Sequence, residues 1–444
     1  MSNNYKRHLE SCSTAACDEE YRHLARRWIL RILAKTEGRQ RYFRKRAEND
    51  AISAFLGYTP GGNGRKEEEW NRWLDSALEE EERKECPREG ALFDNIALLT
   101  RLVSLGPVEQ EVLTFRALFR ANEALYELME QHFRTMSVAT AARVLGVALE
   151  RPQAEIESVL CQDGALFKSG LLNIAEGIMP FERKIYAVYG LLNALLRRNA
   201  SLDDFLSFAA HRAAEPRLAR EDFPHVAQDI DMLVRFIATA TRAGQRGINV
   251  LVHGVPGVGK SEWVRLLAKE LGMRLYEVNM VEEGSGLALR PNDRFGSYRL
   301  NQRLLAQDRD VLVMFDEMED VFPDFLRRLT SHREQGLDKA WVNRLLEENP
   351  VPTFWIANDI EHMDRAHLRR FSYVFELRNP PRSVRRRIAG HYLAGLGVGD
   401  AWVESQLERD TLTPALIEQS AREVQGAHLT GREAEMCFER IIRN

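Results

Sequence analysis

The sequence contains no apolar run that approaches the ~18 residues from which a membrane-spanning helix is built. Its opening residues, MSNNYKRHLE, lack the apolar core of a secretory signal. Only five cysteines occur among 444 residues, a sparse and odd number that is typical of a reduced protein without a disulfide framework. Cys12 and Cys17 lie near His8 and His23, but their spacing fits no common zinc pattern. These absences predict a cytoplasmic protein with no membrane span and no zinc site.

A strong charge of either sign is also lacking. The net charge of −4 does not predict a polyanion as partner of the whole molecule. No H-E-x-x-H protease motif occurs, and no N-K-x-D motif for guanine recognition. The apolar and charged fractions, 44% and 29%, are those of an ordinary globular protein, and the length suggests about two to four domains.

Residues 249–261, NVLVHGVPGVGKS, contain the pattern G-x-x-x-x-G-K-[ST] of a phosphate-binding P-loop. An apolar run precedes the pattern and an amphipathic helix follows it, which is the context that a P-loop requires. Glycines let backbone N–H groups approach phosphates, and a helix that begins at Lys260 directs its N-terminal dipole at the anion. Lys260 supplies charge to the β- and γ-phosphates, and the Ser261 hydroxyl is a ligand for Mg²⁺. The predicted nucleotide-binding residues are Gly254, Val255, Pro256, Gly257, Val258, Gly259, Lys260, Ser261 and Glu262.

Two later apolar runs end in polar residues that suit ATP hydrolysis. A run of five, residues 311–315, ends in Asp316 and Glu317, the Walker B pattern. A buried strand there would deliver Asp316 to the Mg²⁺ shell, together with Ser261, and Glu317 to the attacking water. A further apolar strand ends at Asn358, which would hold the lytic water or the γ-phosphate if that strand lies beside the P-loop. We therefore predict ATP and Mg²⁺ as ligands and ATP hydrolysis as the reaction.

Arg369 and Arg370 precede Phe371 and a final strand. The order of P-loop, Asp-Glu, strand-end Asn and Leu-Arg-Arg-Phe resembles the AAA+ ATPases, and within them the AAA group that includes spastin and katanin, over residues 222–444. The resemblance implies Asn358 as the sensor-1 residue. It also implies Arg370, with Arg369, as arginine fingers that act on a neighbouring subunit of a homo-oligomer, expected to be a hexamer. A guanidinium near the γ-phosphate stabilises the charge of the transition state.

The resemblance further implies an α/β P-loop core, with three αβα layers around a parallel sheet at 216–378, followed by a helical lid at 379–444. The last lid helix begins near Arg432, about where many AAA+ proteins place a sensor-2 arginine. The AAA group often lacks that arginine, so a solvated lid residue is the alternative. Many AAA unfoldases carry an aromatic residue in the loop after the second strand, but residues 281–287 contain none, and Leu287 is the only weak substitute. Threading of a polypeptide through a pore is therefore not predicted.

The N-terminal half is predicted to be mostly helical, basic and then acidic over 1–90, with a second helical domain at 91–215. The segment 22–46 is the most basic of the chain. It either binds nucleic acid or an acidic partner, or forms a helix neutralised by acidic residues at 67–69 and 79–82. The second interpretation is favoured because no base-reading motif accompanies the charge.

Residues 137–175 suggest helix, turn, helix and wing, the order of a winged-helix domain. The second of these helices begins with Gln153, followed by Glu155 and Glu157, and the two glutamate carboxylates would repel phosphates. A protein contact is therefore favoured over DNA recognition.

Two functions remain open at this point. One is an oligomeric ATPase that remodels a protein or protein complex chosen by the N-terminal region, and bacterial AAA proteins with a helical N-terminal half resemble this chain overall. The other is an ATP-gated assembly switch or scaffold, with nucleic acid bound through 22–46 as one candidate partner.

Overall fold

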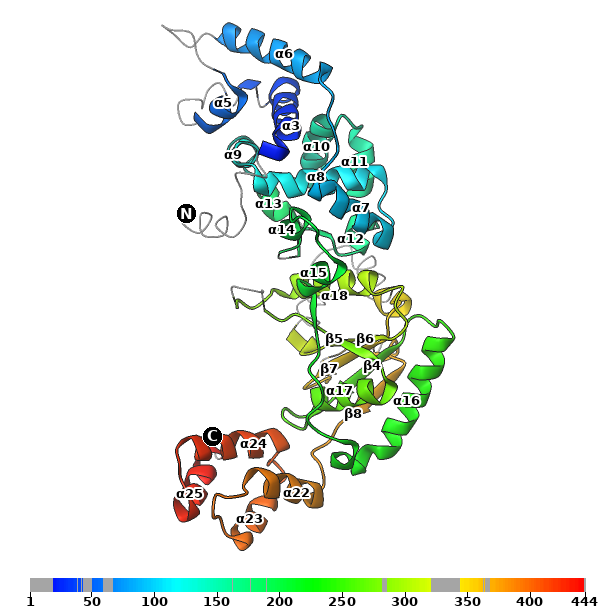
Figure 1. Cartoon of the computed structure of the whole chain (residues 1–444), viewed down its shortest axis with the longest axis vertical. Coiled ribbons are helices and arrows are strands. Elements are labelled where there is room, and N and C mark those ends of the chain that lie inside the picture. The colour runs from blue at the N-terminus through cyan, green and yellow to red at the C-terminus, as the bar shows by residue number, and fades with distance from the viewer. Residues whose placement is uncertain are drawn as a thin grey trace. The chain divides into compact units, whose positions relative to one another are not determined.

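The structure is a computed structural model that describes residues 19–442 except 38, 41, 43–49, 59–66, 162, 176, 189, 282–285, 321–343, 362 and 364–367. It contains two compact units (Figure 1). The first, here the helical unit, comprises residues 1–209, 280–289 and 295–304. The second, here the sheet unit, comprises residues 210–279, 290–294 and 305–444. Among the described residues, no helix is long and apolar enough to cross a membrane.

In the helical unit, the two predicted regions 1–90 and 91–215 are in contact through α3 and α10. Helix α3 buries one apolar face, including Trp28 and Leu33, and packs on α6 and α10. Its elements are α3 (Arg22–Lys35), α5 (Asp50–Leu56), α6 (Glu67–Arg83), α7 (Ala91–Val103), α8 (Pro107–Ala121), α9 (Glu123–His132), α10 (Val138–Leu149), α11 (Gln153–Val159), α12 (Ala165–Lys168), β1 (Leu172–Ile174), α13 (Phe181–Lys184), β2 (Ile185–Ala187), α14 (Leu191–Leu195) and α15 (Leu202–Ser207).

The winged-helix pattern is present in part and extends further than predicted. Ser137 caps α10 by accepting a hydrogen bond from the Thr140 amide, and Glu150 ends that helix in a left-handed conformation. The expected two-stranded wing is not contained in 164–174. Residues 165–168 form a helical turn, and β1 pairs antiparallel with β2, at Ile185–Ala187, beyond the predicted limit of 175.

The sheet unit is built on six strands in the order β3-β5-β6-β7-β4-β8. All neighbours are parallel except β3 and β5. Strands β6 and β7 are buried at every residue, as expected for parallel strands covered on both faces. The strands are β3 (Ala210–Arg212), β4 (Asn249–His253), β5 (Arg274–Val278), β6 (Val311–Phe315), β7 (Thr353–Ala357) and β8 (Tyr373–Glu376).

Helices beside this sheet include α16 (Ala227–Arg242) and α17 (Lys260–Leu271), which contact each other (Figure 1). Helix α18 (Pro291–Leu304) follows β5. The described residues also include the short 3-10 turns η2 (Arg220–Asp222), η3 (Pro224–Val226) and η4 (Met318–Asp320). Strand β3 was not predicted, because residues 210–212 fell in a region that the sequence marks as helical. It pairs with β5, His211 opposite Glu277, so the chain joins this sheet at Ala210.

The C-terminal helices form a cluster with a hydrophobic core of their own around Ile417 and Phe438. They are α22 (Arg382–Tyr392), α23 (Asp400–Leu407), α24 (Pro414–Gly426) and α25 (Gly431–Ile441). This arrangement agrees with the helical lid that the sequence predicts after residue 379. The fold is that of a P-loop NTPase core with helical additions, as expected.

Candidate nucleotide-binding site

The predicted site residues follow three strands that are neighbours in the sheet. The P-loop follows β4, Asp316 and Glu317 follow β6, and Asn358 follows β7, which lies between those two strands. Ligands of open parallel sheets bind at the carboxyl ends of the strands. A cavity of about 390 Å³ lies there, lined by Arg217, Leu218, Pro256, Gly257, Gly259, Lys260, Ser261, Glu262, Asp316, Glu317, Asn358, Ile388, Tyr392, Pro414, Ala415 and Glu418.

Two glycines of the P-loop are required by close approach of other chain segments. Gly254 has φ 149°, and a Cβ there would lie 2.2 Å from the Leu377 carbonyl oxygen. Gly257 has φ 82°, and a Cβ would lie 2.7 Å from the Thr413 hydroxyl at the start of α24. Val258, by contrast, is buried in the hydrophobic core and does not line the cavity. The loop backbone, rather than the Val258 side chain, therefore faces the ligand space.

Lys260 is buried at the first position of α17, with 7% of its surface exposed. Its ammonium donates to the carbonyl oxygens of Gly254 (2.7 Å) and Val255 (3.2 Å) and to Asn358 Oδ1 (2.8 Å). An ammonium has three N–H donors, so these bonds occupy all of them. Burial lowers the pKa of Lys260, with Asp316 and Glu319 opposing that shift. A phosphate that enters the loop must take donors from these three oxygens.

Ser261 and Asp316 form the part of the site that fits a divalent cation. The Ser261 hydroxyl donates to Asp316 Oδ2 over 2.7 Å, although the two residues are 55 positions apart. A hydroxyl and a carboxylate are the hard oxygen ligands that Mg²⁺ prefers, and both line the cavity. Asp316 Oδ1 also accepts the Glu317 amide at 2.8 Å, which orients the carboxylate. The residues present therefore fit Mg²⁺ beside the β- and γ-phosphates.

Glu317 and Asn358 lie at the same cavity. Glu317 is exposed and has φ 48°, a left-handed conformation that is uncommon for a residue with a Cβ. The Asn358 amide nitrogen donates to Glu319 Oε1 over 2.5 Å, and its backbone N–H donates to the same oxygen over 3.0 Å. Lysine only donates and an ionised carboxylate only accepts, so Lys260 and Glu319 together fix which way the Asn358 amide points. Glu319 was not predicted as a site residue.

Arg369 and Arg370 are exposed and lie at the amino ends of the strands, whereas the cavity lies at their carboxyl ends. They precede β8, whose Tyr373 pairs with Val250 at the start of β4, and the Ser372 amide donates to the Asn249 carbonyl over 2.8 Å. Arg370 forms an ion pair with Glu347. Neither arginine lines the cavity of its own chain.

Arg432 is exposed on α25 and does not line the cavity either. The lid elements that do so are α22, through Ile388 and Tyr392, and the start of α24, where the Ala415 amide donates to the Gly257 carbonyl over 3.0 Å. The start of α24 reads Thr413-Pro414-Ala415 and holds no arginine. Of the two interpretations of Arg432, its position favours a solvated lid residue.

An ionic chain that sequence reasoning missed leads away from the P-loop helix. Glu262, next to Ser261, accepts the Arg217 backbone amide at 2.8 Å and pairs with Arg265 at 2.7 Å. Arg265 also pairs with Glu277 at 2.8 Å, and Glu277 lies 3.5 Å from His211 on β3. The hydrogen bond to Glu277 raises the pKa of His211. No sequence signal marks this set, because each charge finds its partner only in the folded unit.

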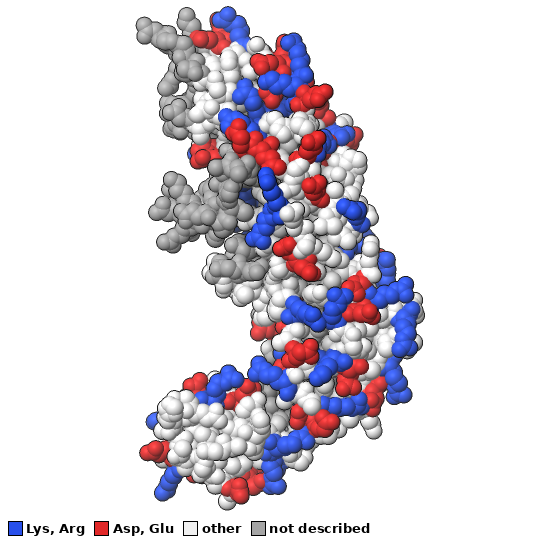
Figure 2. Space-filling view, in the orientation of Figure 1, with Lys and Arg blue, Asp and Glu red and all other residues white. Residues whose placement is uncertain are grey.

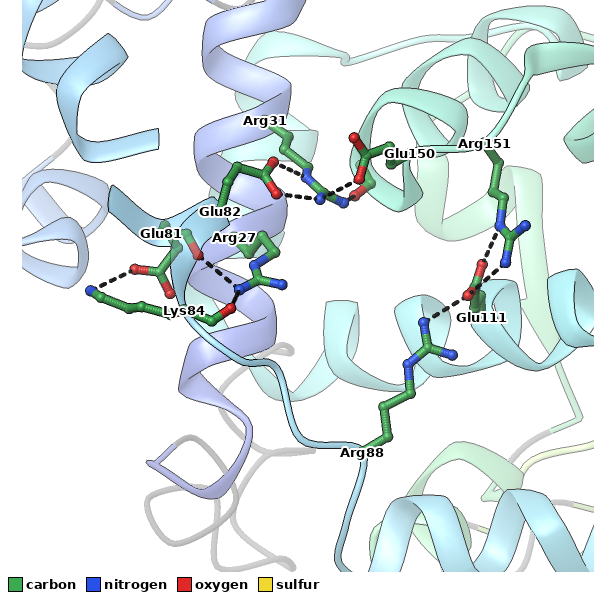
Figure 3. A network of polar contacts seen from close by, with 10 residues as sticks. Arg27, Arg31, Glu81, Glu82, Lys84, Arg88, Glu111, Glu150 and Arg151 are labelled. Carbon is green, nitrogen blue, oxygen red and sulfur yellow. Dashed lines mark hydrogen bonds and ion pairs between the residues drawn. The ribbon is translucent and has the colours of Figure 1, made fainter. Parts of the chain in front are cut away.

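Several arginines of the described part of segment 22–46 pair with acidic residues of their own unit, as Figure 3 shows for Arg31. Arg31 pairs with Glu82 at 2.6 Å and with Glu150 at 2.8 Å, and Arg26 pairs with Glu81 at 3.2 Å. The hydrogen bond from Arg31 lowers the pKa of Glu82. The basic cluster at 44–46 lies outside the described residues.

Charges of both signs are interspersed on the face that Figure 2 shows. This distribution and the ion pairs of α3 favour the interpretation of that helix as a packed, neutralised element.

The loop after β5 exposes two apolar side chains. Val281 and Ala288 form an isolated antiparallel bridge, and 51% of Val281 and 63% of Leu287 are exposed. Residues 282–285, between them, lie outside the described part of the chain. Leu287 is therefore exposed, and its role as a substitute for the aromatic residue stays a prediction.

The sheet order and the groups around the cavity define a P-loop NTPase. Residues 250–379 match the family model described as "ATPase family associated with various cellular activities (AAA)". No curated protein matches the chain.

Among solved structures, similarity is found to the FIGL-1 AAA domain, with 16% identity, a TM-score of 0.36, and coverage of 52% of this chain and 85% of that chain. It is also found to a chain of the E. coli MS115-1 HORMA:CdnC:Trip13 complex, with 16% identity, a TM-score of 0.34, and coverage of 50% and 90%. For C. elegans PCH-2 the identity is 16%, the TM-score 0.35, and the coverage 48% and 68%.

Proposed function

We propose that this chain hydrolyses ATP as a homo-oligomer and uses the hydrolysis to remodel a protein client that its helical unit selects. The observation that carries the proposal is the meeting of Lys260, Ser261, Asp316, Glu317 and Asn358 around one cavity, although they come from three separate strands. Lysine, hydroxyl, paired acids and amide around one cavity are the groups that hydrolysis of a nucleoside triphosphate needs.

Each group has a distinct role in the proposed reaction. Lys260 leaves its three oxygen partners and binds the β- and γ-phosphates. Ser261 and Asp316 would hold Mg²⁺, which would neutralise phosphate charge. Glu317 accepts a proton from water as the water oxygen bonds to the γ-phosphorus and the bond to the β-phosphate oxygen breaks. The Asn358 amide orients the water or the γ-phosphate.

The two exposed arginines support assembly into a ring. Arg369 and Arg370 cannot reach the cavity of their own chain from the amino ends of the strands. In a head-to-tail assembly these amino ends face the cavity of a neighbour, where a guanidinium stabilises the transition state. We propose a hexamer as the closed form, with Arg370 released from Glu347 on assembly.

The alternative of an assembly switch on nucleic acid draws no support from the described part of 22–46. Arg26 and Arg31 are bound to carboxylates of the same unit, so phosphates would have to displace these partners. The proposal therefore retains a protein client.

The test uses Glu317→Gln, which removes the base but leaves the phosphate and metal ligands. The variant is expected to bind ATP and to hydrolyse it at least about 100-fold more slowly than wild type. It is expected to retain client polypeptide on affinity resin only when ATP is present. Lys260→Ala, which cannot hold the phosphates, is the control that retains nothing. ATP turnover at the wild-type rate would remove Glu317 from its role, and recovery of nucleic acid in place of protein would favour the switch.

A further inference from the structure

Arg294 contacts the turn that carries Glu317. It lies in the first turn of α18 and only 4% of its surface is exposed. One guanidinium nitrogen donates to the Asp316 carbonyl oxygen and another to the Glu317 carbonyl oxygen, the second bond being 3.3 Å long. The guanidinium carbon lies 4.7 Å from the centroid of the Phe315 ring, so the planar group is also held over an aromatic face.

These two carbonyl groups belong to the peptide planes on either side of the Glu317 Cα. Rotation about φ of Glu317 turns the plane that carries the Asp316 carbonyl, and rotation about ψ turns the plane that carries the Glu317 carbonyl. A single rigid guanidinium that binds both oxygens therefore restrains both rotations.

The restraint by Arg294 matters because the Glu317 backbone is held in an unfavourable region of φ and ψ. With φ 48°, Glu317 occupies the left-handed region, which persists for a residue with a Cβ only where surrounding contacts enforce it. Asp316 Oδ1 holds the Glu317 amide at 2.8 Å, and Arg294 holds the carbonyls on both sides. Without Arg294 the turn would relax, and the carboxylate would leave the position from which it faces the cavity.

We propose that Arg294 is a positioning residue for Glu317 in ATP hydrolysis, an inference that rests on the proposed function. Arg294 does not line the cavity and so acts through the main chain of Glu317 rather than on the nucleotide. Because the restraint needs two parallel N–H groups at fixed spacing, a lysine, which carries its charge at one point, does not replace it.

The test compares Arg294→Met and Arg294→Lys with the wild-type chain. Both variants are expected to bind a fluorescent ATP analogue within about twofold of wild type, while kcat falls about 100-fold, the cost of a misplaced catalytic group. In the Glu317→Gln background, Arg294→Met is expected to slow hydrolysis no further, since it acts only through that carboxylate. Arg303→Met, an exposed arginine of the same helix, is the matched control and is expected to keep the wild-type kcat.

Amide hydrogen exchange supplies a readout that does not depend on activity. In both Arg294 variants the amides of 316–320 are expected to exchange faster, while those of β4 keep their protection. Unchanged exchange at 316–320, wild-type kcat in Arg294→Lys, or a further rate loss in the Glu317→Gln background would each overturn the inference. Failure of the proposed function itself is distinct, since the wild-type chain would then hydrolyse ATP no faster than Lys260→Ala.

Discussion

Arg370→Ala is expected to abolish ATP hydrolysis without unfolding the chain, because Arg370 serves the cavity of a neighbouring subunit. In its own chain, Arg370 lies at the amino ends of the strands, and the five residues of β4 separate that end from the P-loop. At ~3.3 Å per residue this is about 16 Å along the strand, farther than an arginine side chain extends. The only described carboxylate that pairs with Arg370 is Glu347, and both side chains are nearly half exposed, so the loss of this pair costs at most about 1 kcal/mol of stability.

The expected rate loss is large, since an arginine finger contributes roughly 10³- to 10⁵-fold to turnover. The assay mixes Arg370→Ala with Lys260→Ala subunits in equal amounts and measures phosphate release. Each cavity then needs a lysine from one variant and an arginine from the other, so about a quarter of the cavities in a randomly mixed head-to-tail ring become active. Each variant alone stays inactive.

Two results would refute this reasoning. One is a wild-type rate in Arg370→Ala alone, which would mean that the residue is surface charge. The other is no recovery in mixtures whose co-assembly is demonstrated by size and by differential tagging. Arg246→Ala is the matched control, because Arg246 is exposed just before β4, also at the amino ends of the strands. This substitution is expected to leave turnover unchanged.

Two further predictions concern the P-loop and the ionic chain beside it. Lys260→Ala is expected to weaken ATP binding by roughly 10- to 100-fold or more, because a buried charge-assisted contact to the phosphates is lost, and titration with a fluorescent ATP analogue at unchanged affinity would contradict it. His211 has a pKa raised above its ordinary 6.5 by the hydrogen bond to Glu277, so its stabilisation is complete below about pH 6.5 and is lost as the pH rises through the raised pKa. Melting temperatures of wild type and His211→Gln are therefore expected to differ at pH 6 and to converge at higher pH, and a constant difference would remove His211 from that role.

The sequence itself determined the parts of the site whose chemistry is local. A P-loop needs its glycines, Lys260 and Ser261 at fixed spacing within one short segment. The buried strand before Asp316 and Glu317 is predicted by five consecutive apolar residues. Strands β4, β6 and β7 follow for the same reason, since buried parallel strands read as apolar runs. The helical lid, in contrast, was expected from the resemblance to the AAA+ ATPases.

Other features arise only from contacts between distant parts of the chain. Strand β3 is three residues long, with His211 and Arg212 exposed, so it lacks an apolar signal and exists through pairing with β5. The lid meets the P-loop through α24, not through the helix of Arg432, because the Ala415 amide binds the Gly257 carbonyl. Chain order along the lid could not reveal this choice.

The same distinction separates the residues that perform chemistry from those that hold them in place. The sequence by itself predicted which groups line the cavity, because those groups occur in fixed patterns beside strand ends. Only the tertiary structure decided that Glu319 orients Asn358 and that Arg294 restrains the backbone of Glu317. A carboxylate on a short turn and an arginine on α18 gain these roles solely because the folded sheet unit brings them within hydrogen-bonding distance.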